Sequence, residues 1–441
     1  MDFARSDHPG VQAQLTRLAA LSPGPDILGL ERISALLARL GGPHEALPPV
    51  FHVAGTNGKG STCAFLRAAL EAAGLTVHVY TSPHLVRFNE RIRLAGLLIR
   101  DEALATLLEE VLAAAADMPL SFFEATTAAA FLAFARTPAD AAILEVGLGG
   151  RLDATNVIPR SAVGGIAQLG LDHQQFLGTT IEEVATEKAG IARAGVPLVT
   201  QLYPRRAALS VERAAAEAGA HWLPRRDEWD AIPSAGQLHY RDQAGELALP
   251  LPRLPGNHQA MNAALALAML RHQERLAVPA AALRAMMGWA EWPARLQRLA
   301  PGPLLALLPA GAELWLDGAH NPAAARTIAA WLDGGALGQR PLHLVTGLLA
   351  SKDLPGLLRP FTGSSLTIHP VPVPGHAFHD PALVAAEARK LGLSALPSGS
   401  VEEALAAIAG LSEPRSPPAV LVMGSLYLAG AVLEANGQVP T

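Results

Sequence analysis

The sequence is poor in cysteine, in aromatic residues and in charge. Cys63 is the one cysteine among 441 residues, which excludes an internal disulfide framework and is typical of a reducing compartment. Charged residues make up 17% and apolar residues 50%, so the chain is globular and long enough for two or three domains. The net charge of -5 gives no sign of the positively charged surface that nucleic-acid-binding proteins need.

We expect neither a targeting segment nor a membrane-spanning segment. The start, MDFARSDHPG, has neither the basic region nor the apolar stretch of a secretory signal. The uncharged run Ser416–Leu433 is interrupted by Pro417, Pro418, Gly424 and Gly430, and therefore fits a strand, a tight turn and a helix better than a membrane span. We expect a cytoplasmic protein that binds neither membranes nor nucleic acid.

Lysine is scarce. Among 34 basic residues only Lys59, Lys188, Lys352 and Lys390 are lysines. Arginine keeps its proton, whereas lysine can be neutralised or covalently modified. The four lysines are therefore candidates for tasks that arginine cannot perform.

Short apolar runs alternate with segments of helical periodicity, which indicates βαβ units and a mainly parallel sheet covered on both faces. The predicted strands are Val50–Ala54, Val77–Thr81, Ala141–Val146, Val163–Leu169 and Pro197–Gln201, and the predicted helices are Ser61–Ala73, Asp101–Ala116, Ala125–Ala135, Thr180–Arg193 and Ala260–Arg271. The irregular stretch Trp222–Leu251 predicts a small antiparallel element.

A proline-interrupted stretch, Trp292–Pro309, indicates a domain boundary. Beyond it the alternation resumes in a smaller unit. Its predicted strands are Glu313–Leu316, Leu342–Thr346, Ser365–Val371 and Ala419–Met423. We expect two α/β domains, residues 1–294 and 295–441.

Polar clusters follow four of the predicted strands, at the carboxyl ends where parallel sheets bind ligands. The first, "AGTNGKGST", resembles a phosphate loop but departs twice from the usual G-x-x-x-x-G-K-[ST] pattern. Gly60 follows Lys59 where Ser or Thr is usual, and Val53 stands five residues before Gly58 where Gly is usual. Backbone N–H groups there would bind an anion at the start of a helix, and Lys59 would reach the phosphates. The alternative is a plain glycine turn with a helix cap.

Metal ligands are available at the other strand ends. A nucleoside triphosphate needs Mg²⁺, which prefers a few oxygen ligands and water. Ser82 and Glu145 suit a first ion and His173 suits a second. Each has an ordinary structural alternative, but their convergence at the strand ends favours a metal site.

Other site patterns fail. A dinucleotide fingerprint from Gly147 and Gly149 requires glycine at position 152, where Leu152 stands. The chain contains no C-x-x-C, H-E-x-x-H or G-x-S-x-G pattern, which argues against a zinc site and a serine hydrolase.

Eight motifs in order resemble the folylpolyglutamate synthases, a family of the Mur ligase superfamily, from about Gly29 to Gly430. They are "AGTNGKGST", "TSPHLVRFNERI", "FFEATTAAAF", "EVGLGGRLDATN", "LGLDHQQFLG", "EKAGI", "LDGAHNPAA" and "MGSLYLAG". In this family a glycine follows the loop lysine. The resemblance implies a large N-terminal P-loop ATPase domain with a mainly parallel sheet and a smaller C-terminal Rossmann-like α/β domain.

The resemblance also implies site residues. Those matching ATP contacts are Thr56, Asn57, Gly58, Lys59, Gly60, Ser61, Asn262, Arg295 and Asp317, with His320 expected beside the phosphates across the domain cleft. Ser82 and Glu145 match the ligands of a first Mg²⁺, and His173 and Lys188 those of a second. Lys188 matches a lysine that is carbamylated in relatives. Lys59, His173, Lys188 and His320 are the expected catalytic residues.

A pterin or folate pocket is implied as well. The matching residues are Ile27, Leu28, Gly29, Leu30, Ser121, Phe122, Phe123, Glu124, Leu152, Asp153 and Ala154. We expect one of the two phenylalanines to pack in the core. Two departures from the family pattern are Ser351, which weakens a glutamate-binding role for Lys352, and Ala294, which replaces a usual glycine and concerns the hinge.

The implied activity is ligation of L-glutamate to dihydropteroate and to tetrahydrofolate through an acyl phosphate formed from ATP, in a monomer. Catalysis would come from positioning and electrostatics, with the C-terminal domain closing over the first. Three alternatives stay open: a monofunctional folylpolyglutamate synthase, a peptidoglycan Mur ligase, and a nucleotide-gated switch protein that makes no bond. The "SLYL" and "LDGAHNP" stretches disfavour the second.

Overall fold

The computed structural model describes residues 6–21, 28–116, 118–413 and 415–441. The chain forms two compact units. Unit 1 comprises Met1–Arg253 and Asn257–Trp292, and unit 2 comprises Leu254–Gly256 and Pro293–Thr441. The final passage from one unit to the other lies inside the proline-interrupted stretch.

Unit 1 is built on an eight-stranded sheet of order β4-β3-β2-β5-β1-β6-β7-β8. Its strands are β1 Val50–Ala54, β2 Val77–Tyr80, β3 Ile92–Leu94, β4 Leu97–Leu98, β5 Ala141–Glu145, β6 Val163–Ile166, β7 Pro197–Thr200 and β8 His221–Pro224. Neighbours from β2 to β8 are parallel, and β3 and β4 add an antiparallel edge. The five predicted strands are confirmed, and four of them end one to three residues earlier than predicted.

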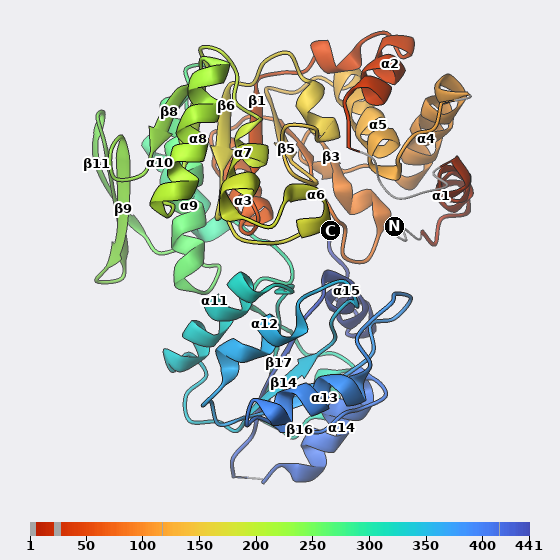
Figure 1. The fold of residues 1–441 in the computed structure, drawn as a ribbon, viewed down its shortest axis with the longest axis vertical. Coiled ribbons are helices and arrows are strands. Elements are labelled where there is room, and N and C mark those ends of the chain that lie inside the picture. The colour runs from red at the N-terminus through yellow and green to blue at the C-terminus, as the bar shows by residue number, and fades with distance from the viewer. Residues whose placement is uncertain (1–5, 22–27, 117, 414) are drawn as a thin grey trace. The chain divides into compact units, whose positions relative to one another are not determined.

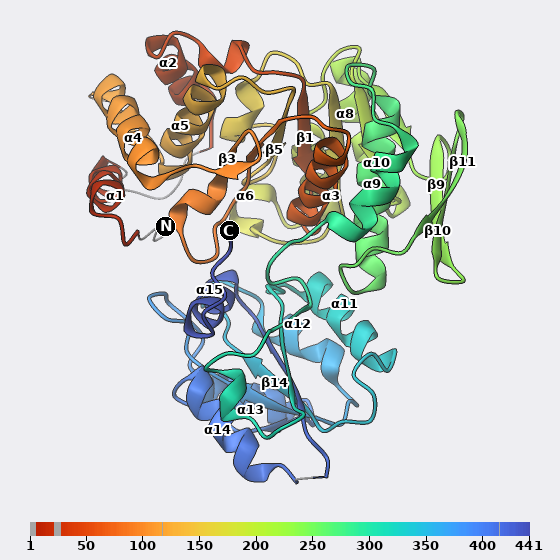
Figure 2. The same cartoon turned by 180° about the vertical axis from the view of Figure 1, so that it is seen from behind.

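Helices cover both faces of this sheet (Figures 1 and 2). On one face α3 and α9 pack against the strands and α10 packs on α3; on the other lie α5, α7 and α8. The helix bounds are α1 Pro9–Leu21, α2 Glu31–Arg39, α3 Lys59–Ala72, α4 Asp101–Ala115, α5 Phe122–Arg136, α6 Gln174–Leu177, α7 Ile181–Ala189, α8 Arg205–Ala218, α9 Asn257–His272 and α10 Ala280–Trp289.

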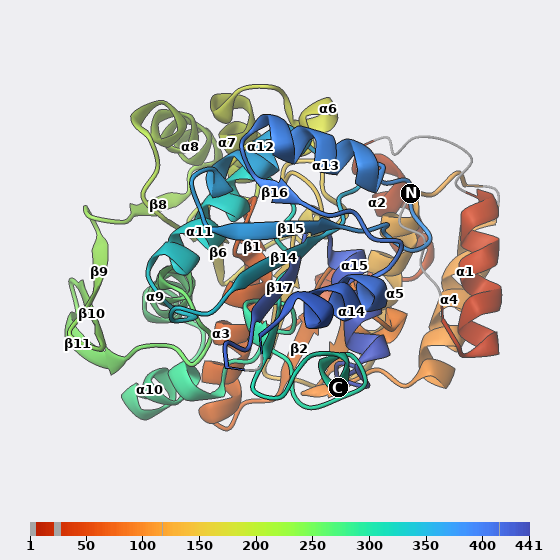
Figure 3. The same ribbon diagram turned by 90° about the horizontal axis from the view of Figure 1, so that it is seen from below.

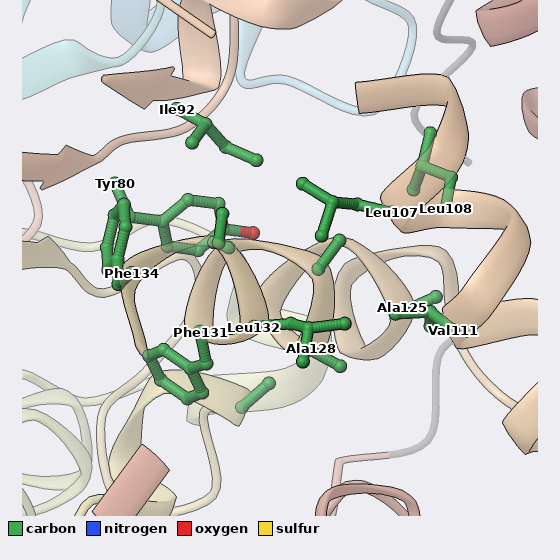
Figure 4. Packing of buried hydrophobic residues seen from close by; sticks show 14 of the residues in the cluster. Tyr80, Ile92, Leu107, Leu108, Val111, Ala125, Ala128, Phe131, Leu132 and Phe134 are labelled. Carbon is green, nitrogen blue, oxygen red and sulfur yellow. The ribbon is translucent and has the colours of Figure 1, made fainter. Parts of the chain in front are cut away.

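The main core of unit 1 surrounds α5. Every residue from Glu124 to Phe134 is buried, as expected of a helix that is apolar all round. Figure 4 shows side chains of β2 and α4, among them Tyr80 and Leu107, packed against this helix. The start of α5 is therefore held by a buried core.

A three-stranded antiparallel sheet, β9 Trp229–Ser234, β10 Gln237–Asp242 and β11 Gly245–Pro250, completes unit 1. It confirms most of the element predicted over Trp222–Leu251. Trp222 itself lies in β8, which extends the main sheet parallel to β7.

Unit 2 has a six-stranded sheet of order β12-β13-β17-β14-β15-β16, parallel except for β12. Helices α11, α12 and α13 cover one face, and α14 and α15 the other (Figure 3). The bounds are β12 Gln297–Arg298, β13 Glu313–Leu316, β14 Leu342–Thr346, β15 Leu366–Pro370, β16 Ser394–Ala395, β17 Ala419–Met423, α11 Pro322–Asp333, α12 Leu354–Leu358, α13 Pro381–Lys390, α14 Val401–Leu411 and α15 Leu426–Ala435.

The apolar run Ser416–Leu433 is strand β17, a turn at Gly424 and most of α15, as predicted. Across the described residues, no helix has both the length and the apolar character needed to cross a membrane. Both units are mixed α/β structures with mainly parallel sheets, which confirms the predicted fold class.

Candidate active site

The loop between β1 and α3 is held against the segment that follows β6. The N–H groups of Thr56 and Asn57 donate to the carbonyl oxygen of Gln168 at 2.8 and 3.1 Å. Gly58 has a φ of +87°, and a Cβ there would lie 2.4 Å from Oδ1 of Asn262. Only glycine fits this position, because of both its backbone and its neighbour. The loop and Asn262 are thus one assembly.

Lys59 and Ser61 open α3 with their polar groups at the loop. Nζ of Lys59 donates to the carbonyl oxygen of Gly55 at 3.0 Å. Ser61 is 1% exposed, and its Oγ has no hydrogen-bond partner among the residues that the structure describes. The neighbouring hydroxyl differs, since Oγ1 of Thr62 donates to the carbonyl oxygen of Gly58 at 2.9 Å. An orphaned hydroxyl at a helix N-terminus suits a phosphate oxygen or a metal ion.

Ser61→Ala is expected to stabilise the protein and to impair its use of ATP. Removing an unpartnered buried hydroxyl relieves a cost of about 1 kcal/mol, so the urea midpoint without nucleotide should rise. The kcat/KM for ATP should fall about tenfold to a hundredfold, because the hydroxyl is lost from the loop. Thr62→Val is the matched control: it removes a hydroxyl that has a partner, and should lower the urea midpoint. A destabilised Ser61→Ala variant with normal ATP kinetics would contradict this role.

The predicted ligands of the first ion lie together. Glu145 is the buried last residue of β5, and its Oε2 accepts a hydrogen bond of 3.4 Å from the N–H of Ser82. No group of three or more His, Cys, Asp or Glu side chains in the described part of the chain is arranged to hold a metal. An ion here would therefore depend on one carboxylate, hydroxyls, phosphate oxygens and water, a ligand set that Mg²⁺ accepts.

Lys188 lies buried in α7. Its burial, and after it the positive charge of Lys59, lowers the pKa of Lys188 to about 7, so a neutral amine is accessible near neutral pH. Asp172 and Asp153 oppose this shift, which places their carboxylates in electrostatic range of the amine. The side chain of His173 is 47% exposed, with Nε2 4.0 Å from Oδ1 of Asp172. Asp172 was missed in the sequence, although it stands beside His173 in "LGLDH".

Three stretches predicted to bind the pterin are brought together. Leu28, Gly29 and Leu30 precede α2, which packs against α5 and against the short helix η3, Ala154–Val157. Ile27 lies outside the described residues. Leu152 and Asp153 directly precede η3.

Ser121 and Glu124 cap the N-terminus of α5. The N–H of Ser121 donates to Oε2 of Glu124 at 2.7 Å, and Oγ of Ser121 accepts from the N–H of Glu124 at 3.2 Å, which forms a capping box. Nε of Arg32 also donates to Oε2 of Glu124 at 3.2 Å. These contacts attach α5 to α2 and fix the helix start.

Phe122 and Phe123 both lie half-buried at the edge of the core. The ring centroid of Phe122 is 5.7 Å from that of Phe88, and that of Phe123 is 5.8 Å from that of Tyr80. A Cβ on Gly147 would lie 2.5 Å from the Phe123 ring, so the glycine loop after β5 rests on this phenyl group.

Asp153 organises the turn before η3. Its Oδ1 accepts from the N–H of Thr155 at 3.0 Å and its Oδ2 from the N–H of Leu148 at 2.8 Å. Burial raises the pKa of Asp153. The carboxylate therefore connects the glycine loop to η3.

Arg295, Asp317 and His320 lie in adjoining segments of unit 2. Asp317 is buried after β13, and its Oδ2 accepts from the N–H of Leu296 at 2.8 Å. Burial raises the pKa of Asp317, and Arg295 opposes that rise. Nδ1 of His320 lies 2.8 Å from the carbonyl oxygen of Gly318, so this nitrogen carries the hydrogen.

Known proteins are similar to this chain in sequence and in fold. Residues 53–270 match the model of the Mur ligase middle domain. The folylpolyglutamate synthase of Lacticaseibacillus casei is 36% identical over 425 residues, which cover 91% of this chain and 93% of that protein. The chain belongs to the folylpolyglutamate synthase family. The dihydrofolate synthase/folylpolyglutamate synthase of Escherichia coli is 39% identical over 332 residues, covering 75% of this chain and 74% of the relative.

Solved structures of the family match nearly the whole chain. E. coli FolC in complex with DHPP and ADP has a TM-score of 0.86 and 34% identity, covering 98% of both chains. The bifunctional folylpolyglutamate synthase/dihydrofolate synthase of Yersinia pestis complexed with AMPPNP and Mn ion has a TM-score of 0.84 and 34% identity, covering 98% of this chain and 99% of that one. These matches confirm the resemblance drawn from the eight motifs.

Proposed function

We propose that this protein is an ATP-dependent ligase that adds L-glutamate to dihydropteroate, forming dihydrofolate, and to tetrahydrofolate, forming polyglutamates. The observation that carries the proposal is the polar edge of the unit 1 sheet, where the phosphate loop, Glu145 and Lys188 gather in a member of the folylpolyglutamate synthase family. The E. coli and Y. pestis relatives carry both activities in their names, which favours the bifunctional form. We expect the protein to act as a monomer.

The proposed chemistry forms one amide bond for each ATP consumed. A carboxylate oxygen of the folate bonds to the γ-phosphorus of ATP, and the bond from that phosphorus to the oxygen of ADP breaks. The amine of L-glutamate then attacks the acyl carbon, loses a proton and displaces phosphate. The charge of Lys59 stabilises the phosphoryl oxygens as this happens. No side chain is needed as a covalent nucleophile.

The ion sites fit Mg²⁺. Ser82 and Glu145, which are joined by a hydrogen bond, would hold a first ion. His173 and Lys188, the latter as a carbamate, would hold a second. Bound ions neutralise negative charge on the phosphates. A carbamate requires a neutral amine, which the lowered pKa of Lys188 supports.

The folate would bind where α2, α5 and η3 meet. Phe122 and Phe123 supply aromatic faces for a pterin ring at the edge of the core. In unit 2, Arg295, Asp317 and His320 are proposed nucleotide and phosphate contacts. Asn262 supplies a further nucleotide contact at the loop.

The proposal is tested by glutamate- and Mg²⁺-dependent phosphate release with dihydropteroate and with tetrahydrofolate, measured side by side. We expect both folates to support release with matching amide formation. Release with tetrahydrofolate alone would identify a monofunctional folylpolyglutamate synthase. ATP hydrolysis that consumes no glutamate would identify a nucleotide-gated switch protein and overturn the proposal.

A further inference from the structure

Trp292 occupies the space that a side chain at position 60 would need. A Cβ built on Gly60 would lie 2.7 Å from two carbon atoms of the Trp292 indole and 2.8 Å from its nitrogen. Gly60 is the second residue of α3, between Lys59 and Ser61, and its φ lies outside the left-handed region. The backbone would therefore accept alanine or serine there, and the indole is what excludes them. This contact explains why glycine follows the loop lysine.

The same tryptophan is the last residue of unit 1, and Pro293 begins unit 2. Two residues further on, the carbonyl oxygen of Ala294 accepts from the N–H of Gly318 at 2.9 Å. The N–H of Leu296 donates to Asp317, and Ala294 and Leu296 have φ of +54° and +44°. Left-handed backbone at two non-glycine residues persists only where the surroundings hold it. The connecting segment is thus anchored at both ends: Trp292 lies beside Gly60 in unit 1, and Ala294 and Leu296 are hydrogen-bonded within unit 2.

The chain also passes from unit 1 to unit 2 after Arg253, and there it leaves unit 1 beside α10. The N–H of Arg253, the last residue before Leu254, donates to the carbonyl oxygen of Met287 in α10 at 2.8 Å. Nη1 of Arg253 donates to Oε1 of Glu291 at 2.9 Å. Helix α10 packs along α3, the helix that follows the phosphate loop (Figure 2). Both connections therefore leave unit 1 next to the packed pair of helices α3 and α10.

We propose that Trp292 is a positioning residue that transmits nucleotide binding at the phosphate loop to the segment connecting the two units. The inference rests on the proposed nucleotide-binding function of that loop. Ligand bound at Lys59 and Ser61 orders the first turn of α3, and the rigid indole, in contact with Gly60 between them, follows that turn. With nucleotide bound, Trp292 is immobilised. The residues that follow it, including Ala294 and Leu296 with their left-handed backbone, are then also held more firmly.

Hydrogen exchange on the full-length protein tests this inference, with AMPPNP and Mg²⁺ as the probe. In the wild type, peptides covering 55–62 and 293–298 should both exchange at least about tenfold more slowly when the nucleotide is added. In Trp292→Leu the loop peptide should keep its protection and the connecting peptide should lose it. Trp292→Phe, which retains a flat ring, should restore most of that protection. Trp289→Leu is the matched control. Trp289 is the last residue of α10, three positions before Trp292, and is 62% exposed.

Full protection of the connecting peptide in Trp292→Leu would overturn the inference, since the nucleotide would then order that segment by another route. Absence of protection at 293–298 in the wild type would overturn it as well. Absence of protection at 55–62 in the wild type would instead refute the phosphate-loop assignment, so the two failures are distinguishable. If Trp292→Leu does not fold, Trp292→Met serves as the second variant: its flexible side chain keeps much of the volume but not the rigid ring, so the connecting peptide should lose the same protection while 55–62 stays protected.

Discussion

Lys59→Ala is expected to abolish ATP-dependent ligation and leave the protein folded. The ammonium group donates to the carbonyl oxygen of Gly55 at 3.0 Å, within the loop that we propose binds the phosphates. Without it, charge that develops on the phosphoryl oxygens loses a preorganised partner, which costs about 10²–10³-fold in kcat. Turnover is measured as glutamate-dependent phosphate release, and folding by circular dichroism.

Lys390→Ala is the matched control for Lys59. It removes another of the four lysines, one that is exposed and paired with Glu387 in α13. This control should retain wild-type turnover. Near-normal turnover in Lys59→Ala would show that the loop does not bind the reacting phosphates.

Lys188→Ala is expected to lose activity by a similar factor and to regain part of it when short-chain carboxylic acids are added. Lys188 is buried, and its lowered pKa makes the neutral amine available for carbamylation. A small acid could occupy the space left by the side chain and supply the carboxylate that we propose a carbamate provides in the intact protein. The measurement is the initial rate of ligation against acid concentration.

Two controls define the Lys188 result. Lys59→Ala should not respond to the same acids, because its missing group is a cation. Lys188→Arg should be inactive, since arginine keeps its proton and cannot form a carbamate. Full activity of Lys188→Ala without any acid would exclude a carbamate role.

The apolar runs predicted most of the fold because parallel strands buried on both faces require them. Each residue of β1 and β5 is buried, and both strands begin where predicted. The polar residues that follow these strands then gathered at one sheet edge for topological reasons alone. The proximity of Ser82 and Glu145 was predicted in this way, and their role as metal ligands stays a prediction.

Packing between distant segments was beyond the reach of the sequence. The contact of Trp292 with Gly60 joins residues more than two hundred positions apart, and no sequence pattern predicted it. The interaction of Asp172 with Lys188 depends on how α7 packs. Ala294 was predicted to concern the hinge, but its left-handed backbone is fixed by Gly318, which no local pattern shows.

Transfer of an oxygen atom tests the central claim most directly. Dihydropteroate labelled with ¹⁸O in its carboxylate would be incubated with ATP, Mg²⁺ and L-glutamate, and the phosphate released would be analysed by mass spectrometry. An acyl phosphate delivers one carboxylate oxygen to each phosphate, so we predict one ¹⁸O atom for every amide bond formed. Unlabelled phosphate would contradict the proposal, because the γ-phosphate would then have passed to water and not to the folate.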